Sequence, residues 1–179
     1  IINKKNKIAV LGSDGFIGSH FYNFINKEFP DAIGTSRKKN ISQNRFFDII
    51  SSDIRSLKLA ESGHTHALIT IAITNIEKCE NAPQETALIN VKKTINLVEA
   101  LLENNIIPII FSSDYVFGGD QGSYSEYSRR YPMNAYGKQK QELEDSLMLT
   151  NKALIVRLSK IYGTKKSDGT FIDVMAKKL

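Results

Sequence analysis

The chain has 179 residues, of which 41% are hydrophobic and 24% are charged, and its formal net charge at pH 7 is +5. These values are those of an ordinary globular protein long enough to bury a core, which excludes disordered and fibrous classes. The basic residues are dispersed rather than gathered in a stripe, so we expect no nucleic-acid partner.

Short apolar runs alternate with helical patterns along the chain. The clearest helix opens at Pro83 and repeats apolar residues at three- and four-residue steps, and a second helix covers 135–148. This alternation predicts an α/β fold with a doubly wound parallel sheet and crossover helices. The six expected strands lie at 8–11, 32–35, 45–48, 67–71, 106–111 and 153–158.

A glycine-rich turn, G-x-x-G-x-x-G, directly follows the first expected strand and leads into a helix that begins with Phe16 and Ile17. Gly12 and Gly15 would let a pyrophosphate approach the backbone N–H groups at the helix N-terminus, and Gly18 would let helix and strand pack closely. Because of this strand–turn–helix context, we predict a dinucleotide site rather than a plain tight turn.

The residues after the second strand bear on the choice of cofactor. An NAD site usually ends this strand with a carboxylate, but Arg37 stands here and is followed by Lys38 and Lys39. A guanidinium can pair with the 2′-phosphate of NADP(H), so we prefer NADP(H), with NAD(H) still open; the alternative is an exposed basic turn. Asp48, at the end of the third strand, is a candidate partner for the adenine amino group or a capping residue.

Two tyrosines are followed four residues later by a lysine, at Tyr136–Lys140 and Tyr162–Lys166. Tyr136 opens a predicted helix, in which residues i and i+4 share a face, whereas Tyr162 leads into a loop. Only the first pair is therefore expected to meet. This pair follows the long irregular segment 112–132, which begins at the carboxyl end of the fifth strand, where open α/β sheets bind ligands.

This pair suits carbonyl reduction, with Tyr136 giving the proton to oxygen. A free phenol has a pKa of about 10, and the charges of Lys140 and of an oxidised nicotinamide favour the phenolate, which should lower the pKa of Tyr136. Lys140 would also hydrogen-bond the nicotinamide ribose. Ser113, at the end of the fifth strand, is the candidate hydroxyl that holds the carbonyl oxygen.

Together these features resemble the extended short-chain dehydrogenase/reductases, whose fold is of the Rossmann type. Within them, F-S-S-D-Y-V-F with a following glycine is similar to the S-T-D-Y-V-F-x-G signature of dTDP-4-dehydrorhamnose reductases. The resemblance covers almost the whole chain. The further matching stretches are 76–80, Asn90, 124–126, 132–140 and 157–163.

The resemblance implies a role for several residues. Gly15, Phe16 and Ile17 would line the pyrophosphate, and Thr70, Ile71 and Ala72 would face the ribose and nicotinamide. Ser113 and Asp114 would contact the sugar. Lys160 stands where the family has an aromatic residue that meets the substrate, which leaves the exact sugar open, and its ammonium could pair with a phosphate or a carboxylate. A solvated lysine is the alternative for Lys160.

The implied function is NADP(H)-dependent reduction of a 4-keto nucleotide-sugar. Dehydration is disfavoured, because the Asp-Glu pair that dehydratases need is Asp114-Tyr115 here. Two alternatives remain: a nucleotide-sugar epimerase, which shares the Ser/Tyr/Lys set, and a non-catalytic dinucleotide-binding subunit such as the regulatory subunit of methionine adenosyltransferase.

The remaining expectations concern domains and location. Residues 1–158 would form the cofactor-binding domain and 159–179, including a helix at 170–179, would begin a small substrate domain that is mostly absent from this chain. Cys79 is the only cysteine, and no Cys/His cluster has zinc spacing, so we expect no metal and a reducing, cytoplasmic location. No apolar run suits a membrane span. A homodimer is compatible with this fold group.

Overall fold

The computed structural model describes residues 5–29, 31–39 and 44–163. Six parallel strands form one sheet in the order β3-β2-β1-β4-β5-β6. This order, with its crossover at β1 and β4, is that of a Rossmann-type sheet and confirms the predicted fold class. The strands are β1 (Lys7–Leu11), β2 (Ile33–Ser36), β3 (Asn44–Phe46), β4 (His64–Ile69), β5 (Ile107–Ser113) and β6 (Leu154–Leu158).

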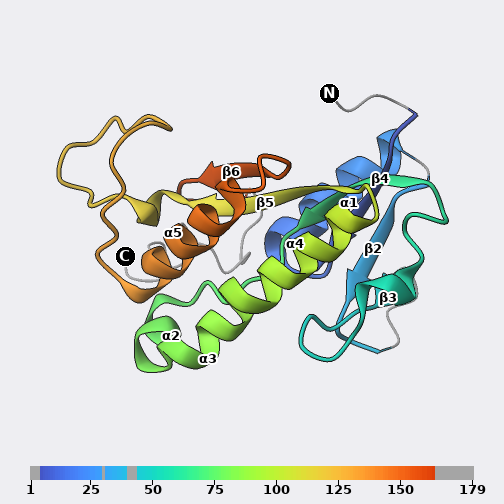
Figure 1. The fold of residues 1–179 in the computed structure, drawn as a ribbon, viewed down its shortest axis with the longest axis horizontal. Helices are drawn as coiled ribbons and strands as arrows, with labels where there is room; N and C mark the ends of the chain where they lie inside the picture. The colour runs from blue at the N-terminus through green and yellow to red at the C-terminus, as the bar shows by residue number, and fades with distance from the viewer. Residues whose placement is uncertain (1–4, 30, 40–43, 164–179) are drawn as a thin grey trace.

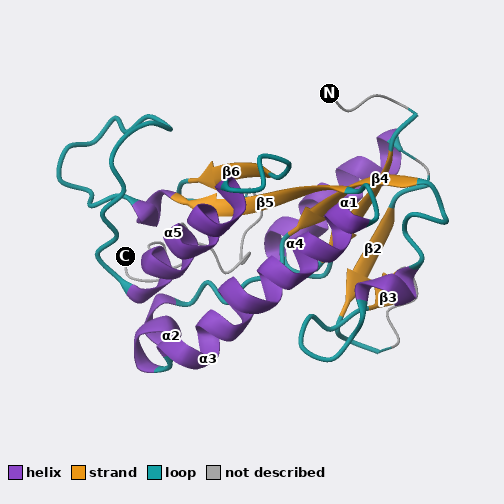
Figure 2. Cartoon of the chain, in the orientation of Figure 1, coloured by secondary structure: helices purple, strands orange, loops and turns teal. Residues whose placement is uncertain are grey.

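Helices cover both faces of the sheet (Figure 2). The α-helices are α1 (Phe16–Glu28), α2 (Ile76–Asn81), α3 (Pro83–Ala87), α4 (Thr94–Glu103) and α5 (Ala135–Met148). A π-helical segment, η2 (Leu88–Lys93), joins α3 to α4, and two 3-10 turns, η1 (Ile54–Leu57) and η3 (Asp114–Val116), complete the set. In the part of the chain that is described, no helix is long and apolar enough to cross a bilayer.

The core has two parts because successive strand residues point to opposite faces. On one face Ile8 and Val10 of β1 pack with Ile25 of α1. On the other face Ala9 and Leu11 belong to a larger cluster that α4 and α5 complete, as Figure 1 shows for the two helices crossing one side of the sheet. Burial on both faces explains why the strands read as apolar runs rather than as alternating patterns.

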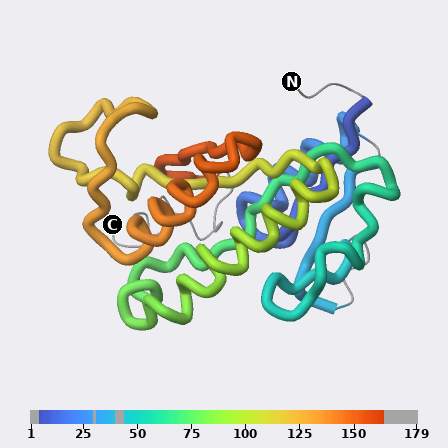
Figure 3. The backbone as a smooth tube through the Cα atoms, viewed as in Figure 1, coloured from blue at the N-terminus to red at the C-terminus, as the bar shows by residue number. Residues whose placement is uncertain are grey.

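The expected elements are present with shifted ends. The predicted helix 135–148 coincides with α5, and the expected helix after Pro83 is divided into α3, η2 and α4. β4 begins at His64, earlier than the predicted 67, and β5 continues through Ser113. The expected helix 170–179 lies outside the described residues. The segment between η3 and α5 forms a long irregular loop, seen in Figure 3 as a tube that projects beyond the end of the sheet.

Candidate active site

The glycine-rich turn brings the N-terminus of α1 against the ends of β1 and β4. Gly12 has a φ of +91°, and a Cβ added there would lie 2.9 Å from the Thr70 hydroxyl. A Cβ on Gly18 would lie 2.1 Å from the Gly12 carbonyl oxygen, so only glycine allows this approach. Gly15 is the N-cap of α1, and no described side chain caps the first turn. Its N–H groups therefore remain available to an anion.

Hydroxyl groups from neighbouring strands hold this turn in place. The Gly12 N–H donates to the Thr35 hydroxyl at 3.1 Å, and the Ser13 hydroxyl donates to the Thr35 carbonyl at 3.0 Å. The Thr70 hydroxyl donates to the carbonyls of Leu11 and Gly12 at 2.9 and 3.0 Å. Thr70, expected on the cofactor side, thus also fixes the turn. Thr35 was not singled out in the sequence, because its partner is 23 residues away.

Two adjoining cavities lie along the carboxyl edge of the sheet. The first has a volume of about 440 Å³ and the second about 360 Å³, and both are lined by Gly15, Thr70, Ile71 and Ala72. The first also holds Phe16, Ile17, Gly18, Ser113, Asp114, Tyr136, Lys140 and Lys160. The second holds Gly12, Arg37 and Asp48. The structure therefore brings all the residues predicted from the sequence into one continuous groove.

The wall of the first cavity carries Tyr136 and Lys140 from α5. Asn134 starts this helix, because its side-chain oxygen accepts the Gly137 N–H at 2.8 Å. Tyr136 is 8% exposed and Lys140 is 4% exposed. The Lys140 Nζ donates to the Phe111 carbonyl of β5 at 2.8 Å, which fixes the ammonium beneath the strand end.

Burial dominates the acidity of both groups. It raises the pKa of Tyr136 to about 12, helped by the nearby Cys79, Asp114 and Tyr115. It lowers the pKa of Lys140 to about 8, against the opposing influence of Glu144 and Cys79. The sequence led us to expect that the charges of Lys140 and of a bound, oxidised nicotinamide together lower the pKa of Tyr136. In the protein without ligand the pKa is raised instead, because desolvation of the phenol dominates, and the effect of the bound cofactor stays a prediction.

Ser113 closes β5 at the floor of the same cavity. Its hydroxyl donates to the Asp114 carboxylate at 3.1 Å and accepts the Tyr115 N–H at 3.3 Å. Ser113 is buried whereas Asp114 is exposed. The two residues expected to meet the substrate are thus already hydrogen-bonded to each other. Lys160 lines the cavity from the segment after β6.

The second cavity is lined by apolar side chains and by basic ones. Ile49, Ile73 and Ile89 line it together with Arg37, which is exposed. Asp48 lies in the turn after β3, not at the strand end as predicted. Its carboxylate accepts the Ile50 N–H at 3.0 Å and the Ser51 hydroxyl at 3.1 Å, which is the capping role that the sequence left open.

A buried polar network links the segment after β4 to α5, and most of its members carry no local signal in the sequence. Asn90, in the π-helical segment, accepts the Ile73 N–H at 2.8 Å and donates to the Ile73 carbonyl at 2.9 Å. It also donates to the Gln139 side chain at 2.8 Å, and Gln139 donates to Thr86 at 2.8 Å. The backbone after β4 is therefore linked, through the Asn90 side chain, to the helix that carries Tyr136 and Lys140.

No group of acidic, histidine or cysteine side chains suited to a metal ion occurs among the described residues.

Comparison with known proteins assigns this chain to a family. The sequence profile of the RmlD substrate binding domain matches residues 6–179. The chain belongs to the RmlD substrate binding domain family. This membership confirms the resemblance indicated by the motifs around Ser113 and Tyr136.

Two relatives with different names are about equally similar to this chain. The dTDP-4-dehydrorhamnose reductase of Aggregatibacter actinomycetemcomitans is 27% identical over 143 residues, which is 73% of this chain and 49% of that protein. The methionine adenosyltransferase 2 subunit beta of Xenopus laevis is 27% identical over 160 residues, which is 88% of this chain and 47% of that protein. The chain thus spans about half the length of these relatives.

Solved structures agree on the fold. The dTDP-4-dehydrorhamnose reductase of Bacillus anthracis str. Ames, in complex with NADP, matches with a TM-score of 0.81 and 24% identity. The match covers 99% of this chain and 61% of that chain. At this level of identity, the likeness supports the Rossmann-type fold of this RmlD family member.

Proposed function

We propose that the protein binds NADP(H) in the groove along the carboxyl edge of the sheet. The turn at Gly12 and Gly15 and the uncapped start of α1 suit a pyrophosphate, and Gly18 lets α1 pack closely on that turn. The two cavities on either side of Gly15 suit the two nucleosides of a dinucleotide. Nicotinamide would lie in the cavity of Tyr136 and adenosine in the cavity of Asp48. Because the Asp48 carboxylate already accepts two hydrogen bonds within its turn, adenine would be recognised mainly by apolar contacts. NAD(H) remains the alternative cofactor.

We propose reduction of a 4-keto nucleotide-sugar as the reaction. The bound cofactor would supply the hydride. Tyr136 would give its proton to the carbonyl oxygen while the Ser113 hydroxyl turns from Asp114 to hold that oxygen. The observation that carries this proposal is the placement of Ser113, Tyr136 and Lys140 on the walls of one cavity, with the phenol and ammonium one helical turn apart.

The buried phenol is well suited to donate rather than to lose its proton. With a pKa raised to about 12, Tyr136 is protonated at neutral pH and can act as the acid of a reduction. The ammonium of Lys140 lies on the same helix face and would stabilise the phenolate that forms. The proton can then be replaced from solvent through the open side of the cavity.

The substrate assignment rests on the residues at the open end of the first cavity. Asp114 and Lys160 would contact the nucleotide-sugar, and residues from 159 onward would begin its substrate-binding part. The preceding residues, 1–158, form the cofactor-binding domain in this proposal. We also propose a cytoplasmic location, and the fold is compatible with a homodimer.

The direct test is titration of the full-length gene product with NADPH and NADH, followed by NADPH oxidation assays with dTDP-4-dehydrorhamnose and other 4-keto nucleotide-sugars. Tight NADPH binding with turnover supports the reductase. An absence of cofactor binding would contradict the proposal at its first step.

A second candidate is a non-catalytic regulatory subunit. The observation in its favour is the 27% identity to methionine adenosyltransferase 2 subunit beta, equal to that of the reductase relative. NADPH binding without turnover of any 4-keto sugar would favour this candidate, whereas interconversion of two nucleotide-sugars without net NADPH oxidation would identify an epimerase.

A further inference from the structure

The face of α5 that carries Tyr136 and Lys140 continues into a buried carboxylate. Glu144 lies one turn beyond Lys140 and is 0% exposed. It accepts hydrogen bonds from the Arg157 Nε at 2.9 Å and Nη2 at 2.7 Å, and from the Arg130 Nη1 at 3.0 Å. Two arginines from different parts of the chain therefore meet on one carboxylate of the proposed catalytic helix.

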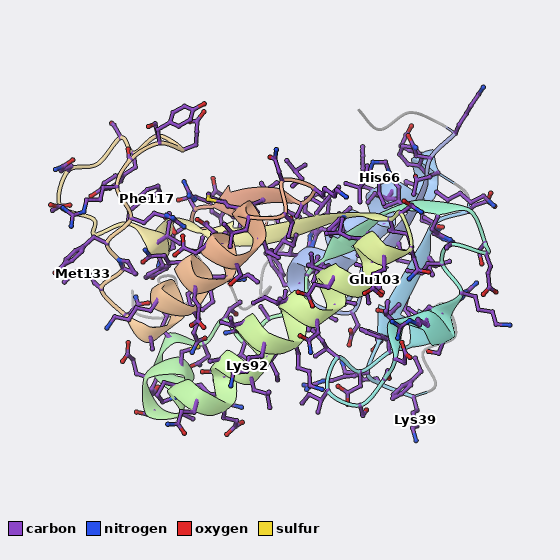
Figure 4. The ribbon with its side chains drawn as sticks, viewed as in Figure 1. Lys39, His66, Lys92, Glu103, Phe117 and Met133 are labelled. Atoms are coloured by element: carbon purple, nitrogen blue, oxygen red, sulfur yellow. The ribbon has the colours of Figure 1, made fainter. Side chains whose placement is uncertain are left out.

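Arg157 also holds the long loop that follows η3. Its Nη1 donates to the Glu126 carbonyl at 3.0 Å, and its guanidinium lies 5.2 Å from the centre of the Phe117 ring. Phe117, labelled in Figure 4, stacks on Tyr124 with the ring centres 4.5 Å apart. The loop 117–132 is thus attached at three points to β6 and α5, through Glu126, Phe117 and Arg130.

The charge of Glu144 also acts on the protonation of Lys140. Burial lowers the pKa of Lys140, and the negative charge of Glu144 opposes that effect. Burial alone would raise the pKa of Glu144, but its bonds to Arg157 and the charges of both arginines lower it, so the carboxylate is ionised at neutral pH. Other groups near Lys140 and Tyr136 are the Phe111 carbonyl from β5, Cys79 from α2, and Asp114 and Tyr115 from η3.

Without the Glu144 carboxylate, the remaining charges would be poorly matched. Among the described residues, Lys140, Arg157 and Arg130 would be left with Asp145, which pairs with Arg130 and whose side chain is 53% exposed, and with Glu126, whose charge acts on Arg157. Of these cations Lys140 is the one that can release its proton near neutral pH, because arginine stays charged. Loss of the carboxylate would therefore be felt at the ammonium beside Tyr136.

We propose that Glu144 is a positioning residue that keeps Lys140 in its charged form beside Tyr136 and, through Arg157 and Arg130, ties the loop 117–132 to the catalytic helix. The catalytic meaning of this inference rests on the proposed function. The state of Lys140 itself can be measured without substrate, so the two proposals can fail separately.

The first experiment follows the Lys140 side chain by the NMR shift of its ¹³Cε during pH titration of the full-length protein without ligand. In Glu144→Gln the midpoint should fall by about one pH unit or more. Glu142→Gln, an exposed position on the same helix, is the matched control and should leave the midpoint unchanged. An unshifted midpoint in Glu144→Gln would overturn the inference.

The pH dependence of kcat is a second measurement, and a purely structural role of Glu144 would not shift it. If the wild type reduces dTDP-4-dehydrorhamnose, the alkaline limb of its kcat profile should move to lower pH in Glu144→Gln, in step with the Lys140 midpoint. A uniform loss of kcat with an unmoved limb contradicts the inference. If the wild type shows no turnover, the proposed function fails while the NMR titration still decides the role of Glu144.

Arg157→Lys covers the case in which Glu144→Gln does not fold. Lysine retains the charge beside Glu144 but loses the bidentate fork and the contact with Phe117. The Lys140 midpoint should then stay at the wild-type value, while trypsin cleaves after the exposed Arg129 faster than in the Glu142→Gln control. A midpoint that falls in Arg157→Lys, or an unchanged cleavage rate, would overturn the inference.

Discussion

The Nζ of Lys140 lies 5.7 Å from the centre of the Tyr136 ring, one helical turn along α5. Both side chains are buried, and the ammonium is held from the far side by the Phe111 carbonyl. This geometry keeps the ammonium close to the phenol. Among the described residues, no hydrogen bond joins the Lys140 Nζ to the Tyr136 hydroxyl. In the proposed reduction, the ammonium would stabilise the phenolate that forms when Tyr136 gives up its proton.

Tyr136→Phe should abolish turnover while leaving NADPH affinity close to that of the wild type. The substitution removes the acidic hydroxyl but keeps the ring that fills the cavity wall, and general acid catalysis typically contributes about 10²–10⁴ in rate. Steady-state kinetics with a 4-keto nucleotide-sugar and fluorescence titration with NADPH measure the two effects. Tyr162→Phe is the matched control, because Tyr162 is 62% exposed. An unchanged rate in Tyr136→Phe would mean that another group supplies the proton.

Arg37→Ala should weaken NADPH binding by roughly 10- to 100-fold and NADH binding far less, since charge-assisted bonds contribute about 1.5–3 kcal/mol. Arg37 lines the second cavity, and the adjacent Lys38 is already paired with Asp14 at 3.4 Å. Lys39→Ala is the control. Lys39 lies over the Phe46 ring instead of the cavity, as its outward position in Figure 4 also shows. Equal losses for both cofactors, measured by calorimetry, would argue against a 2′-phosphate site at Arg37.

The elements that could be predicted are those whose signals are local. Helix α5 has a capping residue, Asn134, and apolar residues such as Leu143 and Leu147 on one face, so its bounds follow from the sequence. The start of β4 was misplaced because His64 and Thr65 are polar, although the strand backbone already pairs with β1 at Lys7. Backbone hydrogen bonding does not depend on side-chain polarity, and an apolar run therefore underestimates a strand.

The polar contacts around the site could not be predicted in the same way. Asn90 and Gln139 are 49 residues apart, and their bond depends on how η2 and α5 pack. The π-helical turn itself has no sequence pattern of its own. The Thr94 hydroxyl donates to the Ile89 carbonyl five residues earlier, whereas in an ordinary α-helix a threonine hydroxyl bonds the carbonyl three or four residues earlier, so this bond follows from the π-helical turn and does not announce it in the sequence. Short helix α2 did carry a signal, because Asn75 caps it by accepting the Lys78 N–H at 2.7 Å.

Gly18→Ala should destabilise the fold by roughly 1–3 kcal/mol, the usual cost of overpacking a close contact. The added Cβ would lie 2.1 Å from the Gly12 carbonyl, so α1 would have to move away from the turn. Gly15→Ala is the matched control, because there the Cβ would lie 3.4 Å from the same oxygen. Urea denaturation of the three proteins checks this difference. Similar stabilities for both variants would show that α1 can move from the turn at little cost.

Folding should become less stable as the pH falls below about 6.5, and His64 should account for part of that loss. Burial is the main reason why the pKa of His64 is lowered, with the charges of Arg45 and Lys7 acting in the same direction. Its Nε2 is buried with no hydrogen-bond partner among the described residues. The unfolded chain therefore binds the proton first as the pH falls. The free energy of unfolding decreases from about 6.5 down to the lower pKa of the folded state, and then levels off.

Urea denaturation at pH 7.5 and at pH 5.5 tests this loss in wild type and in His64→Gln. The variant should lose less stability between the two pH values, because it cannot take up a proton at this position in the unfolded chain. His66 has a pKa that burial also lowers, and it remains in both proteins, so the difference between them reports His64 alone. His20→Gln, at an exposed position on α1, is the control for the replacement of a histidine by glutamine outside β4. If His64→Gln lost as much stability as the wild type, the acid sensitivity would have to arise from other groups. His64 and His66 lie at the start of β4, and Figure 4 shows His66 far from Phe117. The proposed cofactor groove lies at the carboxyl ends of the strands, so protonation of His64 should leave cofactor binding unchanged.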